Sequence, residues 1–544
     1  MVAIVKTHRP LHLEIQRHRQ HSYGLIRSSY REKGRVKHTT HGRLTGMDLS
    51  ELKLIQAAFR GDVTPTGSAE GFRTTESKEY GASYAVLSLA RELGLDRAIY
   101  SRSEPWVEDS LAMIAGRVVH AGSKLALSHH WRSSSLWEQC GTQGAVDVDV
   151  HCYAAMDRLL ARQKAIERTL AQRHLKEGRL VLYDITSSYF EGEYANSELV
   201  LFGYNRDGKR RHEQMVIALV CNEDGCPVGV QVFPGNTQDA STVPAKIAQI
   251  REEYGVKEIV FVGDRGMITL ANAEKISGID GLNTISALTH RQIVDLLARK
   301  VITPELFDER RVVEVMDPEN LSRRYELCRN PLSGQRETKT RQSLLNLTRK
   351  ALETIANAKR KSTGEKIGAR VGRILQQYKM GKFVHWEVQD GKLKWHFDEE
   401  KIAAELLLDG CYVITTDAKP ERMDGEKTVE SYKRLRLVEM AFRNLKTVQL
   451  EVRPVFHKTD ERIRAHVFLC VLAYYLQWNM NQRLKPLFDA DGSGKKREWT
   501  FENVIVRLAA IRREKISLAG SEFQKVTVPE PDQERILDLL GIRL

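Results

Sequence analysis

The stretch RLVLYDITSSYFEG, residues 179–192, marks the point where the chain changes from a helical to a strand-rich pattern. It is rich in β-branched and aromatic residues, which favour strands, and Asp184 directly follows its apolar part LVLY. The next strand-rich stretch, QMVIALVCNEDGCPVGVQVFPG (214–235), contains a central Asp-Gly, which is typical of a hairpin turn. The sequence therefore predicts three meandering strands that begin at residue 179.

Helices and further strands follow in alternation. DASTVPAKIAQIREEYG (239–255) predicts an amphipathic helix, and KEIVFVGDRG (257–266) predicts a buried strand that ends at Asp264. MITLANAEKISG (267–278) predicts another helix, and LNTISAL (282–288) another strand. Three meandering strands and a helical crossover to a parallel strand predict an α/β fold with an RNase H-like core, a mixed sheet with helices on its faces.

The chain is strongly basic, with a net charge of +13 at pH 7 and a sequence pI near 9.2. That balance favours a polyanionic partner, with nucleic acid first, over a merely basic protein. No stretch approaches the ~20 apolar residues of a membrane span, and VFLCVLAYYLQW (467–478) is expected to be a buried helix. The seven scattered cysteines suit reduced thiols, so we expect a cytoplasmic protein with no membrane partner.

Other segments flank or interrupt the predicted core, because 544 residues exceed what one compact core holds. Within the basic N-terminal region, YREKGRVKH (30–38) predicts a small hairpin. The predicted organisation is a basic region that contacts DNA (1–61), a linker (62–82), a helical domain for DNA binding or assembly (83–178), the first part of the core (179–299), an α+β insertion (300–405), the last part of the core with the helix of Glu439 (406–484), and a C-terminal helical region for assembly (485–544).

Three carboxylates are candidate metal ligands. Asp184 and Asp264 stand on strands predicted to be neighbours, and Glu439 stands in the helical stretch SYKRLRLVEMAFRNLKT (431–447). Two divalent cations about 3.5–4 Å apart need several Asp or Glu side chains to orient them and balance their charge. A lone strand-end aspartate is more often a cap or turn residue, and Glu439 alone would suit an i,i+4 ion pair with Arg443. Two aspartates on adjacent strands favour the metal site.

The helix of Glu439 carries polar residues at seven-residue spacing. Tyr432, Glu439 and Lys446 would share one stripe of a continuous helix, with Arg443 one turn from the carboxylate. The apolar residues between them predict that this helix packs on the sheet, so its charged stripe borders a cleft.

Taken together, LYDITSSYFEG, FGYNRDGK, VFPGNTQD, VGDRGMIT and the helix of Glu439 resemble the DDE-type insertion-sequence transposases. The similarity spans roughly residues 83–480 and points to the bacterial cut-and-paste branch with a Y-(2)-R-(3)-E-(6)-K signature. The resemblance implies that Asp184, Asp264 and Glu439 form the catalytic triad and bind two Mg²⁺ ions, which Mn²⁺ can replace. Lys446 carries over as a contact to a phosphate of the transposon end.

The arginine of that signature is missing. Tyr432 carries over as a second phosphate contact, but Leu435 occupies the position three residues later. Arg434 and Arg436 flank Leu435 and project about 100° to either side of it. Arg443 lies on the correct face and is our candidate substitute.

Further basic residues are expected to contact DNA. The loop FGYNRDGKRRHEQ (202–214) suits either a polar connector or a phosphate-binding loop, and its position beside Asp184 favours the second. Near 460, an arginine and a histidine four residues apart would line the site, although a helix cap with structural salt bridges explains that segment about as well. The expected contacts are Arg206, Lys209, Arg210, Arg265 and Arg462.

By resemblance, the chain is a DNA transposase that binds terminal inverted repeats and carries out Mg²⁺-dependent phosphodiester hydrolysis and transesterification. Its partners would be the transposon ends, target DNA and further copies of itself, as a homodimer or higher oligomer in a synaptic complex on the bacterial nucleoid. Two alternatives remain: an RNase H-like nuclease without strand transfer, and a transposase-derived DNA-binding protein without catalysis. A tyrosine recombinase is disfavoured, because no Arg/His cluster of matching order precedes Tyr432.

Overall fold

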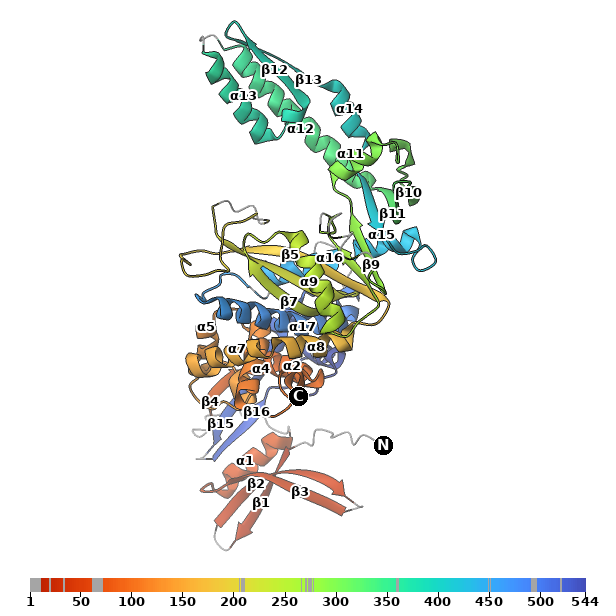
Figure 1. The fold of residues 1–544 in the computed structure, drawn as a ribbon. Coiled ribbons are helices and arrows are strands. Elements are labelled where there is room, and N and C mark those ends of the chain that lie inside the picture. The colour runs from red at the N-terminus through yellow and green to blue at the C-terminus, as the bar shows by residue number, and fades with distance from the viewer. Residues whose placement is uncertain are drawn as a thin grey trace. The chain divides into compact units, whose positions relative to one another are not determined.

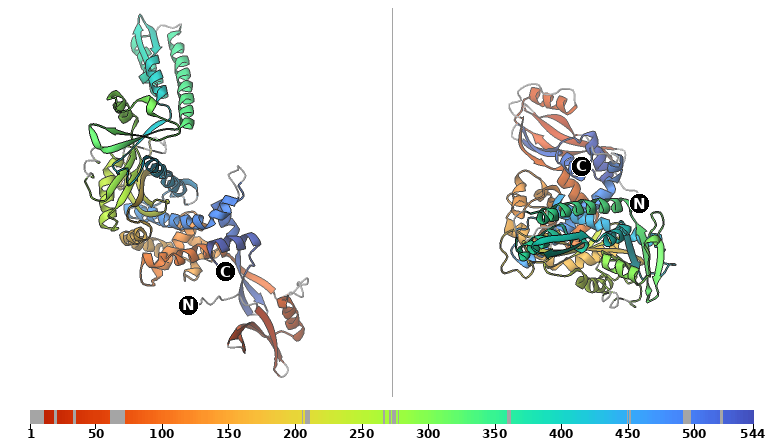
Figure 2. Two further views of the ribbon diagram at one scale, coloured as in Figure 1. Left: turned by 90° about the vertical axis from the view of Figure 1, so that its right-hand side faces the viewer. Right: turned by 90° about the horizontal axis from the view of Figure 1, so that it is seen from above.

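The computed structural model describes residues 11–18, 21–32, 35–60, 72–204, 206, 211–265, 267–269, 272, 276, 278–358, 362–448, 450, 452–490, 497–518 and 521–544. The chain divides into two compact units. One unit joins Met1–Ile166 to Asn444–Leu544, and the other is Glu167–Arg443. Figures 1 and 2 show the helices and strands of both units.

An eight-stranded mixed sheet forms the centre of the unit Glu167–Arg443, in the order β10-β11-β14-β9-β8-β5-β6-β7 (Figure 1). The strands are β5 (Arg179–Tyr189), β6 (Gln214–Asn222), β7 (Pro227–Pro234), β8 (Ile259–Gly263), β9 (Leu282–Ala287), β10 (Val313–Asp317), β11 (Asn320–Arg329) and β14 (Cys411–Thr416). Strands β5, β6 and β7 run antiparallel as a meander, whereas β8 is parallel to both β5 and β9. The predicted mixed α/β sheet is confirmed.

Helix α9 (Asp239–Glu252) connects β7 to β8 and packs on one face of this sheet. The hydroxyl of Tyr183 in β5 donates a hydrogen bond to Thr242 Oγ1 of α9 at 2.8 Å. Because consecutive side chains of a strand point to opposite faces, Asp184 faces away from α9. The helix predicted at 267–278 lies largely outside the described residues.

The main sheet extends into the range predicted as an insertion, because β10 and β11 pair beside β14. The prediction for 300–405 is therefore wrong for these two strands, whose alternating polar and apolar residues did not stand out in a mixed region. The remainder has its own core and contains α12 (Pro331–Ala356), α13 (Gly364–Tyr378), β12 (Val384–Gln389), β13 (Lys392–Phe397) and α14 (Glu399–Leu407). Its Asp390-Gly391 turn joins β12 to β13 in a hairpin in which Trp386 pairs with Trp395.

Helix α17 (Asp460–Ala490) is the central helix of the other unit. It packs against α4 (Pro105–Val119), α7 (Ala154–Ala161) and α2 (Gly81–Glu92). The sequence predicts 460–484 as part of the core, whereas the structure groups this segment with Met1–Ile166. Because the middle of α17 is buried on all sides, its apolar pattern has no face that identifies its neighbours. No helix in the described part of the chain is both long and apolar enough to cross a membrane.

Two small sheets complete this unit. Strands β1 (Leu11–His18), β2 (His21–Glu32) and β3 (Arg35–Leu44) form an antiparallel sheet that packs against α1 (Leu49–Arg60), so the hairpin predicted at 30–38 is present and extends further. Strand β4 (Phe72–Glu79) pairs with β15 (Arg512–Leu518), which pairs with β16 (Ser521–Val526); α18 (Phe501–Ala509) and α19 (Pro531–Leu540) are the C-terminal helices.

The sheet of β4, β15 and β16 differs from two predictions. Residues 72–79 were expected in a linker but form β4, and the C-terminal region was expected to be helical but also contains β15 and β16. The strand FRTTESKE is polar and mostly exposed, and backbone pairing with β15 holds it in place, so hydropathy gives no signal for it.

The end of β4 also caps helix α2. The carboxylate of Glu79 accepts hydrogen bonds from the backbone N–H groups of Ala82 at 2.9 Å and Ser83 at 3.1 Å. It also accepts the hydroxyls of Ser83 and Ser134. Burial alone would raise the pKa of Glu79, but the imidazole of His120, with its Nε2 3.7 Å from the carboxylate, and the hydrogen bonds from these serines hold it below the ordinary value.

We expect Glu79→Ala to lower the free energy of unfolding by about 2–3 kcal/mol, because it leaves buried donors without an acceptor. Urea unfolding followed by tryptophan fluorescence measures the change. Thr74→Ala, on the exposed part of the same strand, is the matched control and should change stability by less than about 0.5 kcal/mol. Equal effects of the two substitutions would contradict the capping role.

Candidate active site

The parallel pairing of β5 with β8 brings two aspartates together. Tyr183 of β5 pairs with Gly263 of β8, and Asp184 and Asp264 each follow that pair by one residue. Neighbouring strands lie about 4.8 Å apart, so the two backbones present these carboxylates side by side. The predicted adjacency of the two strands is what the structure shows.

Asp184 is half-buried and electrostatically strained. Its Oδ1 accepts the backbone N–H of Ile185 at 2.7 Å, which favours the charged form. Burial and the nearby charges of Asp264 and Glu439 outweigh that bond and raise the pKa of Asp184 to about 7. The charges of Asp264 and Glu439 therefore both act on Asp184.

Asp264 is exposed and held from two sides. Its Oδ1 accepts the backbone N–H of Arg265 at 2.7 Å and the hydroxyl of Tyr432 at 3.1 Å. Its backbone carbonyl accepts the hydroxyl of Ser286, in β9, at 3.0 Å. These bonds fix both the chain and the side chain at the end of β8.

Glu439 stands on helix α16 (Leu435–Arg443), which packs against β5. The buried residues of α16 repeat at helical spacing and form its apolar face: Leu435, Val438, Ala441 and Phe442. Glu439 is exposed beside this face, and its charge contributes to the raised pKa of Asp184. The alternative of an ion pair between Glu439 and Arg443 does not occur among the described contacts.

The helix of Glu439 is not continuous, which corrects the prediction of one seven-residue stripe. Helix α15 (Gly425–Lys433) ends before Arg434, and α16 begins at Leu435. From Asn444–Val448 the chain forms the π-helix η5. A π-helix has wider turns than an α-helix, so seven-residue spacing from Glu439 does not set the direction of Lys446, which lies in η5.

Leu435 is buried, with 6% of its surface exposed, and belongs to the apolar face of α16. An arginine at this position would carry its charge into the contact with the sheet. Arg434 instead donates to the carbonyl of Glu223 at 3.4 Å and pairs with Glu430 at 3.3 Å, and Arg436 is exposed.

Tyr432 lies at Asp264, since its hydroxyl donates to that carboxylate. Burial and the charge of Asp264 raise the pKa of Tyr432, and the nearby charge of Arg265 opposes this. Tyr432 is therefore protonated at neutral pH and serves as a hydrogen-bond donor to the carboxylate.

The remaining predicted residues lie in several places. Arg206 pairs with Asp239 at the start of α9, and its charge slightly lowers the pKa of Asp184. Arg265 is exposed beside Asp264, and Arg443 is exposed at the end of α16. Lys209 and Arg210 lie outside the described residues.

Two predicted contacts belong to the other unit. Lys446 is half-buried in η5. Arg462, in α17, lies 3.7 Å from Asp157 and stacks over the ring of Tyr153 at 4.7 Å. The structure thus gives Arg462 the structural partners that the alternative interpretation expected.

Sequence reasoning missed the residues that support the site. Ser286 holds the backbone of Asp264, but a serine in a short strand carries no distinctive signal. Asp417, after β14, accepts the N–H of Thr284 at 2.7 Å and lies 3.8 Å from the buried Arg323. Only the strand order, which places β14 beside β9, reveals that contact.

The three carboxylates suit a divalent cation in their chemistry. All are hard oxygen donors, and no Lys or Arg in the described part of the chain forms an ion pair with any of them. Burial and the charges of Asp264 and Glu439 both raise the pKa of Asp184, and a bound cation would favour its charged form. Among the described residues, no three His, Cys, Asp or Glu side chains lie close enough together to hold one ion.

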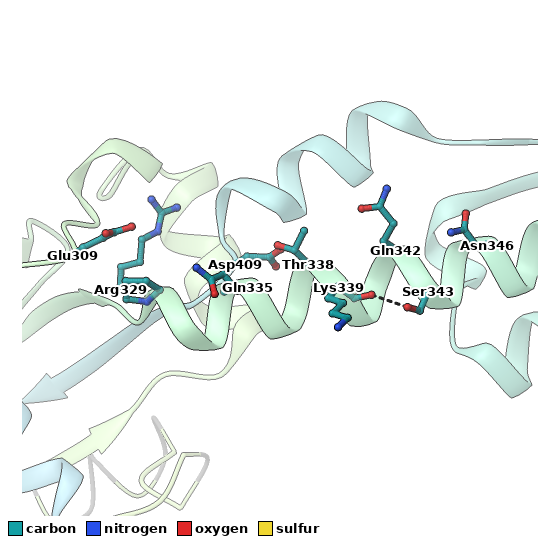
Figure 3. A pocket seen from close by; sticks show the side chains of 11 residues that line it. Glu309, Arg329, Gln335, Thr338, Lys339, Gln342, Ser343, Asn346 and Asp409 are labelled. Atoms are coloured by element: carbon teal, nitrogen blue, oxygen red, sulfur yellow. Dashed lines mark hydrogen bonds between the residues drawn. The ribbon is translucent and has the colours of Figure 1, made fainter.

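A cavity of about 580 Å³ lies elsewhere in this unit, along helix α12 (Figure 3). Its lining is polar and comes mainly from one face of α12, together with Arg329, Glu309 and Asp409. Asp409 is already bound by Arg341 and by the hydroxyl of Thr338. None of the three carboxylates lines this cavity, so we do not assign the chemistry to it.

Comparison with known proteins assigns the chain to a family. Residues 176–476, more than half of the chain, match the family model described as transposase DDE domain. No curated protein matches the chain. Among solved structures, it is similar to a piggyBac transposase in a synaptic complex with hairpin DNA, at 8% identity over 79% of this chain and 76% of that chain, with a TM-score of 0.34. A similarity of that degree supports no conclusion about activity.

The charge of Asp184 should destabilise the metal-free fold. The pKa of Asp184 is higher in the folded protein, about 7, than in the unfolded chain, near 3.9. With respect to this carboxyl, the folded protein is therefore most stable below about pH 3.9, where the group is protonated in both states, and it loses stability as the pH rises towards 7. We expect Asp184→Asn to raise stability at pH 8 in EDTA by on the order of 1–3 kcal/mol, and by much less at pH 4. Thermal unfolding at both pH values measures this. Asp417→Asn, which weakens the contact with buried Arg323, should destabilise instead; a destabilising Asp184→Asn would contradict the repulsion.

Introducing the signature arginine at position 435 should lower the free energy of unfolding. Leu435→Arg removes a buried leucine and places an unpaired charge against the sheet, so we expect a loss of about 3–5 kcal/mol of stability. Met440→Arg, at a position 51% exposed on the same helix, should change stability by less than about 0.5 kcal/mol. Urea unfolding compares the two variants. A Leu435→Arg protein as stable as the wild type would show that position 435 tolerates the family residue.

Proposed function

The chain belongs to the transposases with a DDE domain, and we propose that it catalyses metal-dependent DNA strand cleavage and strand transfer at the terminal inverted repeats of an insertion sequence. The observation that carries the proposal is the register of β5 and β8, which sets Asp184 beside Asp264. Glu439, on helix α16, would be the third carboxylate, and its charge contributes to the raised pKa of Asp184.

Asp184, Asp264 and Glu439 would hold two Mg²⁺ ions. When bound, such a pair activates a water molecule and stabilises the leaving 3′ oxygen in an in-line displacement at phosphorus. The protein supplies fixed carboxylates: Tyr432 orients Asp264 by donating to Oδ1, and Ser286 holds its backbone. Because these contacts hold the carboxylate of Asp264 in place before the substrate binds, little reorganisation of the protein is needed when the phosphodiester reacts.

The DNA substrate follows from the charge of the chain and from family membership. With a net charge of +13, the protein should bind DNA mainly through backbone phosphates, with a few base contacts that select the inverted repeat. Arg265 and Arg443 are exposed in the unit of the triad and are proposed phosphate contacts. Pairing of two ends requires at least two copies of the chain, on bacterial DNA in the cytoplasm.

The proposal is tested with DNA that carries the ends of the segment encoding the protein. We expect Mg²⁺- or Mn²⁺-dependent cleavage that leaves a 3′-OH, followed by joining of that end to target DNA. Asp184→Asn, Asp264→Asn and Glu439→Gln should each lower the cleavage rate by on the order of 10³-fold. Gel analysis of end-labelled DNA measures both steps.

Glu426→Gln is the matched control, because Glu426 is an exposed glutamate on the neighbouring helix α15 and should leave the rate unchanged. Cleavage at the wild-type rate by the three triad variants would refute the assignment. Cleavage without joining would instead identify a nuclease, and binding without cleavage a DNA-binding protein.

A further inference from the structure

A second cavity lies within the unit that joins Met1–Ile166 to Asn444–Leu544. Its volume is about 560 Å³, and its walls come from α4, the helix α5 (Lys124–His129), the segment before α17, and α17 itself. The lining residues are Arg117, Gly122, Ser123, Lys124, Leu125, Tyr153, Pro454, Phe456, His457 and His466. Two of them, Leu125 and Phe456, are 53% and 66% exposed, so the cavity reaches the surface.

The polar lining of this cavity is basic, and no Asp or Glu contributes to it among the described residues. Arg117 and Lys124 are both buried, each with only 5% of its surface exposed. Arg117 makes no hydrogen bond or ion pair with any described residue. A buried guanidinium without an anion is rare, since Arg is seldom buried unless it is paired.

The tautomer of His466 leaves an acceptor for Lys124. His466 Nε2 lies 3.1 Å from the carbonyl of Val452 and must donate to it. Nδ1 is therefore free to accept, and Lys124 Nζ donates to it at 2.5 Å. His466 is neutral in this arrangement, and Lys124 has two further N–H donors.

The cations of the cavity repel one another. Burial and the charge of Arg117 lower the pKa of Lys124 to about 7. Burial and the charges of Lys124, Arg462 and Arg117 lower the pKa of His457 to about 4. The cluster is thus a preformed site of positive potential whose counter-charge is not supplied by the described residues around it.

We propose that this cavity binds a phosphate group, held by Arg117 and Lys124. The planar guanidinium matches two oxygens of a phosphate, and the ammonium of Lys124 adds a charge-assisted donor. The apolar side chains of Tyr153, Pro454 and Phe456 give the cavity a wall against which a sugar or base can pack. The phosphate is either a phosphodiester of DNA or a free phosphate, and both share this recognition chemistry.

None of the three carboxylates lines this cavity, so phosphate binding can be tested separately from the proposed cleavage activity. Inorganic phosphate is the first probe, used with the full chain and no divalent metal. We expect 10 mM phosphate to raise the Tm of the wild type by about 3 °C relative to chloride at equal ionic strength. Isothermal titration should show that Arg117→Gln weakens phosphate binding about tenfold or more, and that Arg117→Lys retains part of the affinity.

Arg97→Gln is the matched control, since Arg97 is an exposed arginine of the same unit that does not line the cavity. A purely structural Arg117 would behave differently: Arg117→Gln would then lower the Tm in phosphate-free buffer. Our proposal expects its Tm there to be unchanged or higher, because the substitution removes a repelled charge.

A DNA duplex identifies the source of the phosphate. If the cavity holds a phosphodiester, Arg117→Gln should reduce the slope of log affinity against log salt concentration by about 1. If it holds free phosphate, the slope stays the same while phosphate binding is lost. The proposal is overturned if the wild type binds no phosphate and the slope is unchanged, or if Arg97→Gln impairs binding as much as Arg117→Gln.

Discussion

The parallel hydrogen bonding between β5 and β8 is the constraint on which the candidate site depends. It makes Tyr183 and Gly263 register partners and so sets the next residues, Asp184 and Asp264, side by side. A shift of one residue would turn one of the two side chains to the opposite face of the sheet. Helix α9 crosses from β7 to β8, and the hydroxyl of Tyr183 donates a hydrogen bond to this helix on the face opposite Asp184. Strand β5 thus carries a structural contact at Tyr183 and a candidate metal ligand at the next residue, Asp184, on the opposite face of the sheet.

Each of the two units contains a group of side chains of like charge, negative in one unit and positive in the other. In Glu167–Arg443, burial and the charges of Asp264 and Glu439 raise the pKa of Asp184, and the charge of Arg206 only partly opposes them. In the other unit, Arg117 and Lys124 gather without an anion, and the pKa of Lys124 falls. Both arrangements store electrostatic repulsion that a ligand of opposite charge would release. Elsewhere, the buried Arg323 lies near Asp417, and Arg341 pairs with the buried Asp409.

The strands and the two aspartates could be predicted because their signals are local. Apolar runs such as LVLY before Asp184 mark a buried strand by composition alone, and the order of strands and helices restricts the topology. The break at Arg434 could not be predicted, since no Pro or Gly marks it and the helical periodicity continues through it. The same applies to β4, whose polar sequence is held by backbone pairing with a strand more than 400 residues later. Tyr432 was identified, but its contact with Asp264 depends on packing that spacing does not encode.

Strands β11 and β14 are direct neighbours, and Arg329 at the end of one pairs with Cys411 at the start of the other. Helix α12 begins just after the first of these residues, and α14 ends just before the second. The whole helical and hairpin insertion is therefore carried as the loop of one β-hairpin. During synthesis, β14 can join the sheet only after that loop has emerged from the ribosome. Because the loop has a core of its own, it can fold first and bring the two strand ends close, which lowers the entropy cost of closing the sheet.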